Sequence, residues 1–579
     1  MGGGVRRDLI AAAAVVVAAV LLAWTKFVDG DLGFHLATGR EVLATGSIPR
    51  TNVLSFTNAS YPWHLHQWLP AVLFEWSFRE WGMAALQALK VALVAATWLV
   101  TYAAARLAGA DPLPASVATL LGAGAAAFRF ELRPYLFTHL ALAGSVAGSA
   151  QALRAAARPL ARWPPSSGLL WAGAIPVVAC HFHAGAIDGW LVLGALALSV
   201  ALPRRAAGSP DFARRARDAV SIGAVLVASV ALAALTLSLY HPYGARILLF
   251  PFDMGTDAYL AEHLIEFRAP YQFPLELLAI YWVLAGAAIA SWAACGRSLH
   301  AFWAVVTLGF LLLSLRHARL AFGFAVVAVP LVALGLQRLL AHLRAALPLL
   351  VAAALLLTVV GHRYVFGRPG IGFVERSFPV HLFAYLDQQA LSGNIFASDA
   401  WAGPLLGHAY PRRRAFFDNR FEAYPRAFFQ DVYQRIRYAQ PGWDALLDRY
   451  HVEIVLMRYT SAGELRFQNE KPNLRQRLAA DARWALIYFD DLGVVYVRRD
   501  GRNAAQARAH ALPGLDPDRM QFLGMPGQSR EGLRGAVARG LRSRRLLLMA
   551  ATAEGDGGDP RQEQLLQQRA EAIPPFDGW

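Results

Sequence analysis

The sequence predicts a multispanning α-helical membrane protein that carries a C-terminal α/β domain outside the membrane. Three observations lead to this fold class. The chain has a mean hydropathy of +0.36 and only 16% charged residues, whereas soluble proteins carry about 25%. Apolar Ala/Val/Leu runs near the ~20 residues that cross a bilayer recur through residues 1–361. After residue 361, short strand-type and helical patterns alternate instead.

The apolar runs mark about 11 transmembrane helices, although several runs are shorter than an ideal span. Their predicted positions are residues 8–25, 83–105, 115–128, 135–153, 168–182, 187–202, 219–240, 274–294, 300–315, 320–336 and 346–361. The first run has a basic start like that of a signal peptide, but it lacks a convincing small-residue cleavage site. We therefore expect it to remain as the first membrane helix.

The expected domain organisation has three parts. Residues 1–361 form a transmembrane domain with a long first outer loop, 25–82. Residues 362–500 form an extracytoplasmic α/β domain, with strands expected at 394–399, 415–420, 453–458, 484–490 and 494–499 and helices at 425–439 and 442–450. Residues 501–579 form a tail that is expected to be partly disordered.

Arginine placement predicts the orientation of the membrane helices. Arg6 and Arg7 precede the first run, and alternate loops then receive many further arginines, for example within 154–162 and 204–217. Loops rich in Lys and Arg stay in the cytoplasm, so we expect a cytoplasmic N-terminus and a periplasmic C-terminal domain in a bacterial inner membrane. The same arginines account for much of the net charge of +15, which argues against a nucleic-acid partner.

The two cysteines exclude some kinds of site. Cys180 and Cys295 fall at the ends of predicted helices on opposite sides of the membrane. A disulfide between them is therefore not expected, and the sequence contains no zinc or redox spacing.

The first predicted outer loop carries an acidic motif, "DGDLGFH", directly after the first helix. If this segment is helical, Asp31 and His35 lie on one face at i and i+4. Asp31 could serve as a helix N-cap, but that interpretation leaves Asp29 unexplained. An aspartate near a membrane surface is a suitable general base, and the Asp–His set could also hold a divalent cation. Asp29, Asp31 and His35 are therefore the candidate catalytic residues.

Two histidine pairs occur in loops predicted on the same side of the membrane. "WHLHQW" places His64 and His66 two residues apart, and "CHFHAG" repeats this spacing at His181 and His183. In an extended segment, residues two apart point the same way. Such pairs could contact a phosphate or a metal, or they could pack in the membrane interface like other amphipathic side chains.

Two arginine clusters also lie at this predicted boundary. "RFELRP" contains Arg129, Glu131 and Arg133, and "RHARL" contains Arg316 and Arg319. These arginines could reach lipid headgroups or grip a phosphate with two parallel hydrogen bonds. In the α/β domain, Asp418 and Arg420 follow a predicted strand, where they could bind a ligand or close a loop as a structural pair.

This pattern resembles the GT-C superfamily of integral-membrane glycosyltransferases. The resemblance rests on the first helix followed by a long outer loop with an acidic motif, on the amphipathic helices of that loop, on the number of spans and on the exterior α/β domain. More narrowly, the stretches "DGDLGFHLATGREVLATGSIPR" and "ASDAWAGPLLGHAYPRRRAFFDNRFEAYP" resemble segments of poorly characterised bacterial GT-C-like proteins.

The resemblance implies a glycosyltransferase that moves a sugar from a polyprenyl-phosphate-linked donor to a lipid, glycan or protein acceptor at the outer face of the membrane. Asp29 or Asp31 would deprotonate or orient the acceptor. His35, His64 and His66 would shape the acceptor side, and Arg316 and Arg319 would grip the donor phosphate. The neighbourhood of the motif departs from the family, whose typical members keep further acidic residues in later outer loops. Here the only candidates for those positions are Glu131, Asp188, Glu262 and Glu266.

Two other functions remain open from the sequence. A catalytically silent GT-C-like scaffold could use its exterior domain to bind partners in the cell envelope. A transporter is less consistent with the pattern, because the polar residues gather on one face and no inverted repeat is visible. The sequence names neither the sugar nor the acceptor, and it leaves any divalent-cation cofactor undecided.

Overall fold

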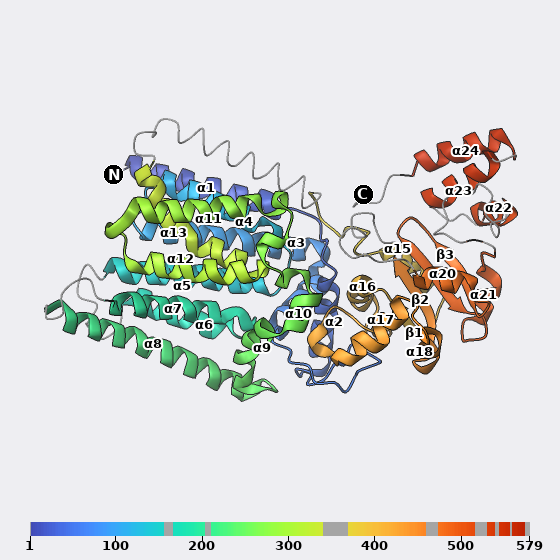
Figure 1. The fold of residues 1–579 in the computed structure, drawn as a ribbon, viewed down its shortest axis with the longest axis horizontal. Coiled ribbons are helices and arrows are strands. Elements are labelled where there is room, and N and C mark those ends of the chain that lie inside the picture. The colour runs from blue at the N-terminus through green and yellow to red at the C-terminus, as the bar shows by residue number, and fades with distance from the viewer. Residues whose placement is uncertain are drawn as a thin grey trace. The chain divides into compact units, whose positions relative to one another are not determined.

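A computed structural model describes most of the chain (Figure 1). The described residues are 2–155, 166–202, 210–339, 369–458, 473–513, 515, 530–538, 543–555 and 558–573. They form two compact units. The helical unit comprises Met1–Phe27, Thr45–Ile48 and His64–Gly372, and the sheet unit comprises Val28–Ala44, Pro49–Trp63 and Phe373–Trp579. The first predicted outer loop is therefore shared between the two units.

Long helices make up the helical unit. They are α1 (Gly2–Ala23), α3 (Trp68–Leu107), α4 (Pro112–Ala126), α5 (Tyr135–Ala155), α6 (Ser167–Ala179), α7 (Ile187–Ala201), α8 (Pro210–Tyr240), α11 (Leu275–Cys295), α12 (Ala301–Arg316) and α13 (Ala321–Leu339). Every predicted span within the described residues coincides with one of these helices. The span predicted at 346–361 lies outside the described residues.

Five helices in the described part of the chain are long and apolar enough to cross a membrane. They are Trp68–Leu107, Ala184–Ala201, Arg215–Tyr240, Leu275–Cys295 and Ala318–Leu339. The helix α13 is buried continuously from Ala321 to Ala333 and packs against α3, α4, α11 and α12. A helix that is apolar on all sides belongs in the interior of a bundle, so α13 forms the centre of this unit.

The amphipathic, Trp-rich segment of the first loop continues directly into a membrane helix. Residues 68–81 and the predicted span 83–105 form one helix, α3, with a kink at Gly82. Gly82 has φ +70° and ψ −159°, a conformation that residues with a Cβ atom rarely adopt. The glycine therefore allows the amphipathic part to change direction relative to the span.

Short helical segments connect the spans, and two of them carry the candidate residues Arg129 and Arg319. The segments are η1 (Ala127–Arg129), η2 (Ala184–Ala186), η3 (Gly244–Leu249), α9 (Phe250–Thr256), α10 (Ala258–His263), η4 (Ile265–Phe267), η5 (Pro270–Gln272), η6 (Gly296–Ser298) and η7 (Ala318–Leu320).

The sheet unit contains a mixed four-stranded sheet with strand order β1-β2-β4-β3. The strands are β1 (Asn394–Ala397), β2 (Val452–Arg458), β3 (Trp484–Phe489) and β4 (Gly493–Arg498). β1 and β2 are parallel, whereas β4 is antiparallel to both of its neighbours. The hydrophobic core of the unit includes Trp401, Leu405, Ile454 and Val495, all at most 1% exposed.

The sheet unit also contains helices. They are α2 (Asp31–Thr45), α15 (Val380–Gln388), α16 (Asp399–Ala409), η8 (Phe421–Ala423), the π-helix η9 (Phe428–Tyr433), α17 (Gln434–Arg437), α18 (Trp443–Arg449), α20 (Asn473–Ala480), α21 (Ala504–His510), α22 (Arg530–Ala538), α23 (Arg544–Gly555) and α24 (Pro560–Glu571). The last four lie in the segment that the sequence predicts to be partly disordered. Of all these helices, α18, α20 and α21 contact strands of the sheet.

The strand predicted at 415–420 is wrong. Ala415 forms only an isolated bridge with Ser55, and the chain then turns. Asp418 accepts hydrogen bonds from the backbone N–H of Arg420 at 3.0 Å and from its Nε at 2.9 Å. An aspartate that bonds the backbone two residues ahead favours a turn over a strand.

Helix α2 packs closely against α16 within the sheet unit. An ideal Cβ atom on Gly33 would lie 2.2 Å from the carbonyl oxygen of Gly403, so only glycine fits there. Arg40 then donates hydrogen bonds to the carbonyls of Gly407 at 3.2 Å and Tyr410 at 2.8 Å, at the C-terminal end of α16. The segment that follows the first membrane helix is thus an integral part of the sheet unit.

Candidate functional site

The acidic motif lies at the start of α2, in the sheet unit. The Asp29 carboxylate accepts a hydrogen bond from the backbone N–H of Asp31, the first residue of α2, at 3.1 Å. Both aspartates are partly exposed, and His35 is buried one turn later at 2% exposure. The expectation that helix capping leaves Asp29 unexplained is therefore wrong, because Asp29 supplies the capping bond that the structure shows.

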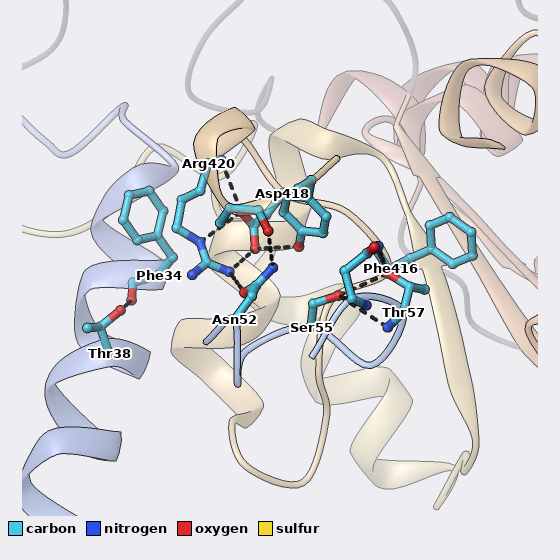
Figure 2. A network of polar contacts seen from close by, with 11 residues as sticks. Phe34, Thr38, Asn52, Ser55, Thr57, Phe416, Asp418 and Arg420 are labelled. Carbon is cyan, nitrogen blue, oxygen red and sulfur yellow. Dashed lines mark hydrogen bonds and ion pairs between the residues drawn. The ribbon is translucent and has the colours of Figure 1, made fainter. Parts of the chain in front are cut away.

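Asp418 and Arg420 form a buried network with the first loop (Figure 2). The Arg420 Nη2 donates to Asp418 Oδ2 at 2.6 Å and to Asn52 Oδ1 at 2.8 Å. Tyr424 donates its hydroxyl to Asp418 Oδ2 at 3.1 Å. The side chains of Arg420 and Asp418 are 1% and 0% exposed. Since both Asp418 oxygens are bonded within this network, the pair has the geometry of a structural contact.

Three of the predicted arginines converge on one glutamate in the helical unit. Arg129 at the end of η1 donates from Nη1 to Glu266 Oε2 at 2.6 Å. Two further arginines lie at ion-pair distance from the same carboxylate, Arg133 at 3.9 Å and Arg319 at 3.6 Å. The loops that carry these residues join α4 to α5, α8 to α11 and α12 to α13.

The electrostatics of this arginine cluster, defined as Arg129, Arg133, Arg319 and Glu266, favour an anionic ligand. Three positive charges against one negative charge leave a net charge of +2. Burial alone would raise the pKa of Glu266, but the three guanidinium groups outweigh burial and hold this pKa well below its ordinary range. The carboxylate is therefore ionised, and the cluster keeps an excess of positive charge.

Two buried nitrogen atoms beside this cluster have no hydrogen-bond partner among the residues that the structure describes. They are Arg129 Nε and His317 Nε2. The other ring nitrogen of His317, Nδ1, donates to the carbonyl of Phe267 at 2.6 Å. Because buried polar groups are usually bonded, these atoms are consistent with a ligand at this end of the helical unit.

Histidine and aromatic rings gather in the same unit. His66 stacks on Phe250 with ring centroids 4.2 Å apart and lies 5.1 Å from the ring of His183. His64 contacts Tyr243 at 4.1 Å. Burial, with a smaller contribution from the positive charge of Arg319, lowers the pKa of His66 to about 3. His66 is thus a neutral ring within electrostatic range of the arginine cluster.

The remaining candidates of the helical unit have the following contacts. His181 bonds through its ring nitrogens to Tyr240 and Thr236, and His183 bonds to Thr138 at 2.9 Å. Arg316 ends α12, is exposed and makes no ion pair within the described ranges. Glu131 lies within electrostatic range of Lys90, whose ammonium donates to the Thr25 carbonyl at 2.5 Å.

A metal site does not emerge from these residues. Within the described part of the chain, no group of three or more His, Cys, Asp or Glu side chains is arranged to hold a metal ion.

Sequence reasoning missed some participants. It gave no role to Asn52, Tyr243 or Phe250, and it treated Glu266 only as one of several acidic residues. Asn52 had no signal beyond its place in a turn-rich loop. The loops contain more arginines than acidic residues, and this excess could have indicated that several arginines share one acidic residue such as Glu266.

The solved structures that match this chain include two that bear on its fold. The apo crystal structure of the Archaeoglobus fulgidus oligosaccharyltransferase matches with a TM-score of 0.54 and 13% identity, over 78% of this chain and 69% of that chain. The crystal structure of ArnT from Cupriavidus metallidurans bound to undecaprenyl phosphate matches with a TM-score of 0.50 and 13% identity, over 84% of this chain and 97% of that chain.

Both proteins are GT-C glycosyltransferases. This chain is a membrane protein with a GT-C-like fold. The resemblance noted in the sequence is thereby confirmed for the architecture. No protein-family model and no curated protein matches the sequence.

Proposed function

We propose that this chain is a membrane glycosyltransferase that moves a sugar from a polyprenyl-phosphate-linked donor to a lipid, glycan or protein acceptor. The observation that carries the proposal is the arginine cluster in a chain with a GT-C-like fold. The reaction would take place at the periplasmic face of a bacterial inner membrane, with the N-terminus in the cytoplasm. The arginine-rich loops that alternate along the sequence support this orientation.

The donor phosphate would bind to the arginine cluster. Guanidinium groups match phosphate oxygens in geometry and charge. Glu266 neutralises one of the three positive charges and leaves a net charge of +2 for the cluster. The ArnT structure contains undecaprenyl phosphate, which makes a polyprenyl phosphate the first ligand to test here. During transfer, the bond between the sugar carbon and the phosphate oxygen breaks and its electron pair stays on the phosphate. The arginines would stabilise that developing charge.

The acceptor would be activated by the first-loop carboxylates. Asp29 or Asp31 would accept the proton of the acceptor hydroxyl or amine as it attacks the sugar carbon. His35, His64 and His66 would shape the acceptor side, and His181, His183 and Glu131 remain proposed substrate contacts. No step in this proposal requires a metal ion.

Binding of undecaprenyl phosphate to the full-length protein in nanodiscs tests the donor site. We expect Arg319→Gln to weaken binding at least tenfold. The loss should be smaller for Arg316→Gln, because Arg316 is exposed and lies outside the arginine cluster. Arg79→Gln is the matched control, since Arg79 is exposed and pairs only locally with Glu80. Equal binding by wild type and Arg319→Gln would refute this donor site.

The pairing of charged side chains favours a second candidate function, that of a catalytically silent scaffold. The arginines share Glu266, and Asp418 pairs with Arg420, as expected of a catalytically silent scaffold in which charged groups satisfy one another. The scaffold function predicts normal folding and no sugar transfer by the wild-type protein. A transfer assay with purified protein and envelope extract therefore separates the two functions.

A further inference from the structure

The first loop is bound into the sheet unit by residues distant in sequence. Asn52 Oδ1 accepts a hydrogen bond from Arg420 Nη2 at 2.8 Å across a separation of 368 residues. The same side chain donates from Nδ2 to the carbonyl of Ala423 at 2.9 Å. Asn52 is 0% exposed, so its amide makes both of these hydrogen bonds with the 418–424 turn and none with bulk water.

Further contacts join the same two segments. The backbone N–H of Ala415 donates to the carbonyl of Leu54 at 2.9 Å, and that of Phe56 donates to the carbonyl of Ala415 at 3.2 Å. Thr57 donates its hydroxyl to the carbonyl of Phe416 at 2.6 Å. Figure 2 shows the Thr57–Phe416 bond near the Asn52–Arg420 contact. We call Asn52, Asp418, Arg420 and Tyr424 the clasp.

The clasp also contacts the helix that carries the acidic motif. The Arg420 guanidinium lies 4.3 Å from the ring of Trp63 and 5.6 Å from the ring of Phe34 on α2. Figure 2 places the Arg420 side chain between α2 and the residues of the turn. Arg420 therefore touches both first-loop segments of the sheet unit, Val28–Ala44 and Pro49–Trp63.

The charges of Asp418 and Arg420 in the clasp compensate each other, as expected of a structural contact. Asp418 neutralises Arg420 inside the protein, and burial of such a pair is tolerated only with good geometry and additional hydrogen bonds. The structure supplies these bonds from Asn52, Tyr424 and the backbone of Arg420. A planar guanidinium with several donors is needed for this arrangement, and lysine would not reproduce it.

We propose that Asn52 and Arg420 are positioning residues, which fix the first-loop carboxylates by binding the loop to the C-terminal sheet unit. The exterior domain would then be part of the catalytic apparatus, because it holds Asp29 and Asp31 in place. Reaction rates are sensitive to displacements of a catalytic group by about 1 Å. The proposal rests on the function proposed above for Asp29 and Asp31.

Hydrogen exchange and turnover of the full-length protein in nanodiscs test this proposal together. Asn52→Leu and Arg420→Met each break the contact between the first loop and the 418–424 turn. We expect exchange in residues 28–44 and 49–63 to accelerate about tenfold or more, while β2 and β4 keep their protection. We also expect kcat to fall about tenfold or more with little change in KM for the lipid donor.

A disulfide provides the rescue. Ser55 and Ala415 face each other in an isolated bridge, so Ser55→Cys with Ala415→Cys can join the segments covalently in the Asn52→Leu background. If the clasp acts by position, oxidation should restore slow exchange and most of the kcat. Arg483→Met is the control, because Arg483 pairs with Asp481 and Asp444 in the same unit and should change neither readout.

Two results would overturn the proposal. Unchanged exchange in both clasp variants would show that the clasp does not hold the first loop. Faster exchange with normal kcat would show that the loop position does not matter for the reaction. A wild-type protein without turnover would refute the proposed function instead, and the exchange measurements would then still decide whether the clasp fixes the loop.

Discussion

The Asp29 side chain has two roles that mutation can separate. It accepts the backbone N–H of Asp31 at 3.1 Å, and in the proposed function it carries the negative charge that removes a proton from the acceptor. Asp29→Asn keeps an oxygen that can accept the same hydrogen bond but removes the charge. Asp29→Ala removes both.

The two roles differ in the size of the effect expected on their loss. Loss of a capping bond costs about 1 kcal/mol of stability, within a range of roughly 0.5–2. Loss of a general base lowers the rate by roughly 100- to 10,000-fold, or about 3–5 kcal/mol in the activation barrier. Asp29→Asn should therefore keep the capping bond and turn over at least about 100-fold more slowly. Asp29→Ala should show the same loss of turnover together with a loss of stability.

The assay pairs donor turnover with thermal unfolding in the same detergent. Asp559 is the matched control, because it accepts the backbone N–H of Arg561 at 2.9 Å at the start of α24. Asp559→Ala should reduce stability and leave turnover unchanged. Wild-type turnover in Asp29→Asn would refute the reasoning, since the capping bond alone would then explain the residue.

Three further predictions follow from buried or close contacts. Glu266→Gln should lower the free energy of unfolding by about 3 kcal/mol, because three guanidinium groups lose their shared counter-ion. The same substitution should tighten binding of undecaprenyl phosphate. Weaker binding in a thermal-shift titration would contradict this prediction. Burial lowers the pKa of His66 from 6.5 to about 3, so between these values the unfolded chain binds a proton that the folded chain does not. The free energy of unfolding should fall as pH drops below 6.5, by up to about 1.4 kcal/mol per pH unit. Between pH 7 and pH 5, the free energy of unfolding should change less in His66→Phe than in wild type. An equal change in both proteins would show that other groups cause the pH dependence. Gly33→Ala places a Cβ atom 2.2 Å from the Gly403 carbonyl oxygen and should destabilise the protein by more than about 1 kcal/mol, whereas a wild-type unfolding midpoint would refute the close packing of α2 on α16.

Local patterns in the sequence were sufficient for the long helices of the helical unit. Each predicted span in the described residues coincides with a helix, since hydropathy over about 20 residues is a local property. The prediction failed at 415–420, where the apolar residues Phe416 and Phe417 suggested a strand. The hydrogen bonds from Asp418 to the backbone and side chain of Arg420 favour a turn there, and a propensity-based prediction does not include them.

The candidate site could be predicted only in part, because tertiary contacts decide which charges meet. Arg316 and Arg319 are equivalent in the sequence, yet Arg319 reaches Glu266 and Arg316 remains exposed at the end of α12. The sequence pattern around the short turn η7 does not show which of the two arginines will reach Glu266. Similarly, the sequence offered both a ligand site and a structural pair for Asp418 and Arg420. The contacts with Asn52 and Tyr424, which the local sequence pattern does not show, favour the structural pair.

Transfer of a labelled sugar tests the central claim most directly. Full-length protein in nanodiscs would be incubated with a panel of polyprenyl-phosphate-linked sugars and envelope extract, and label in the acceptor fraction would be measured. We predict transfer from at least one donor by wild type, reduced at least about tenfold in Arg319→Gln and in Asp29→Asn. Folded wild-type protein that transfers no sugar from any donor, or transfer that both variants retain in full, would contradict the account.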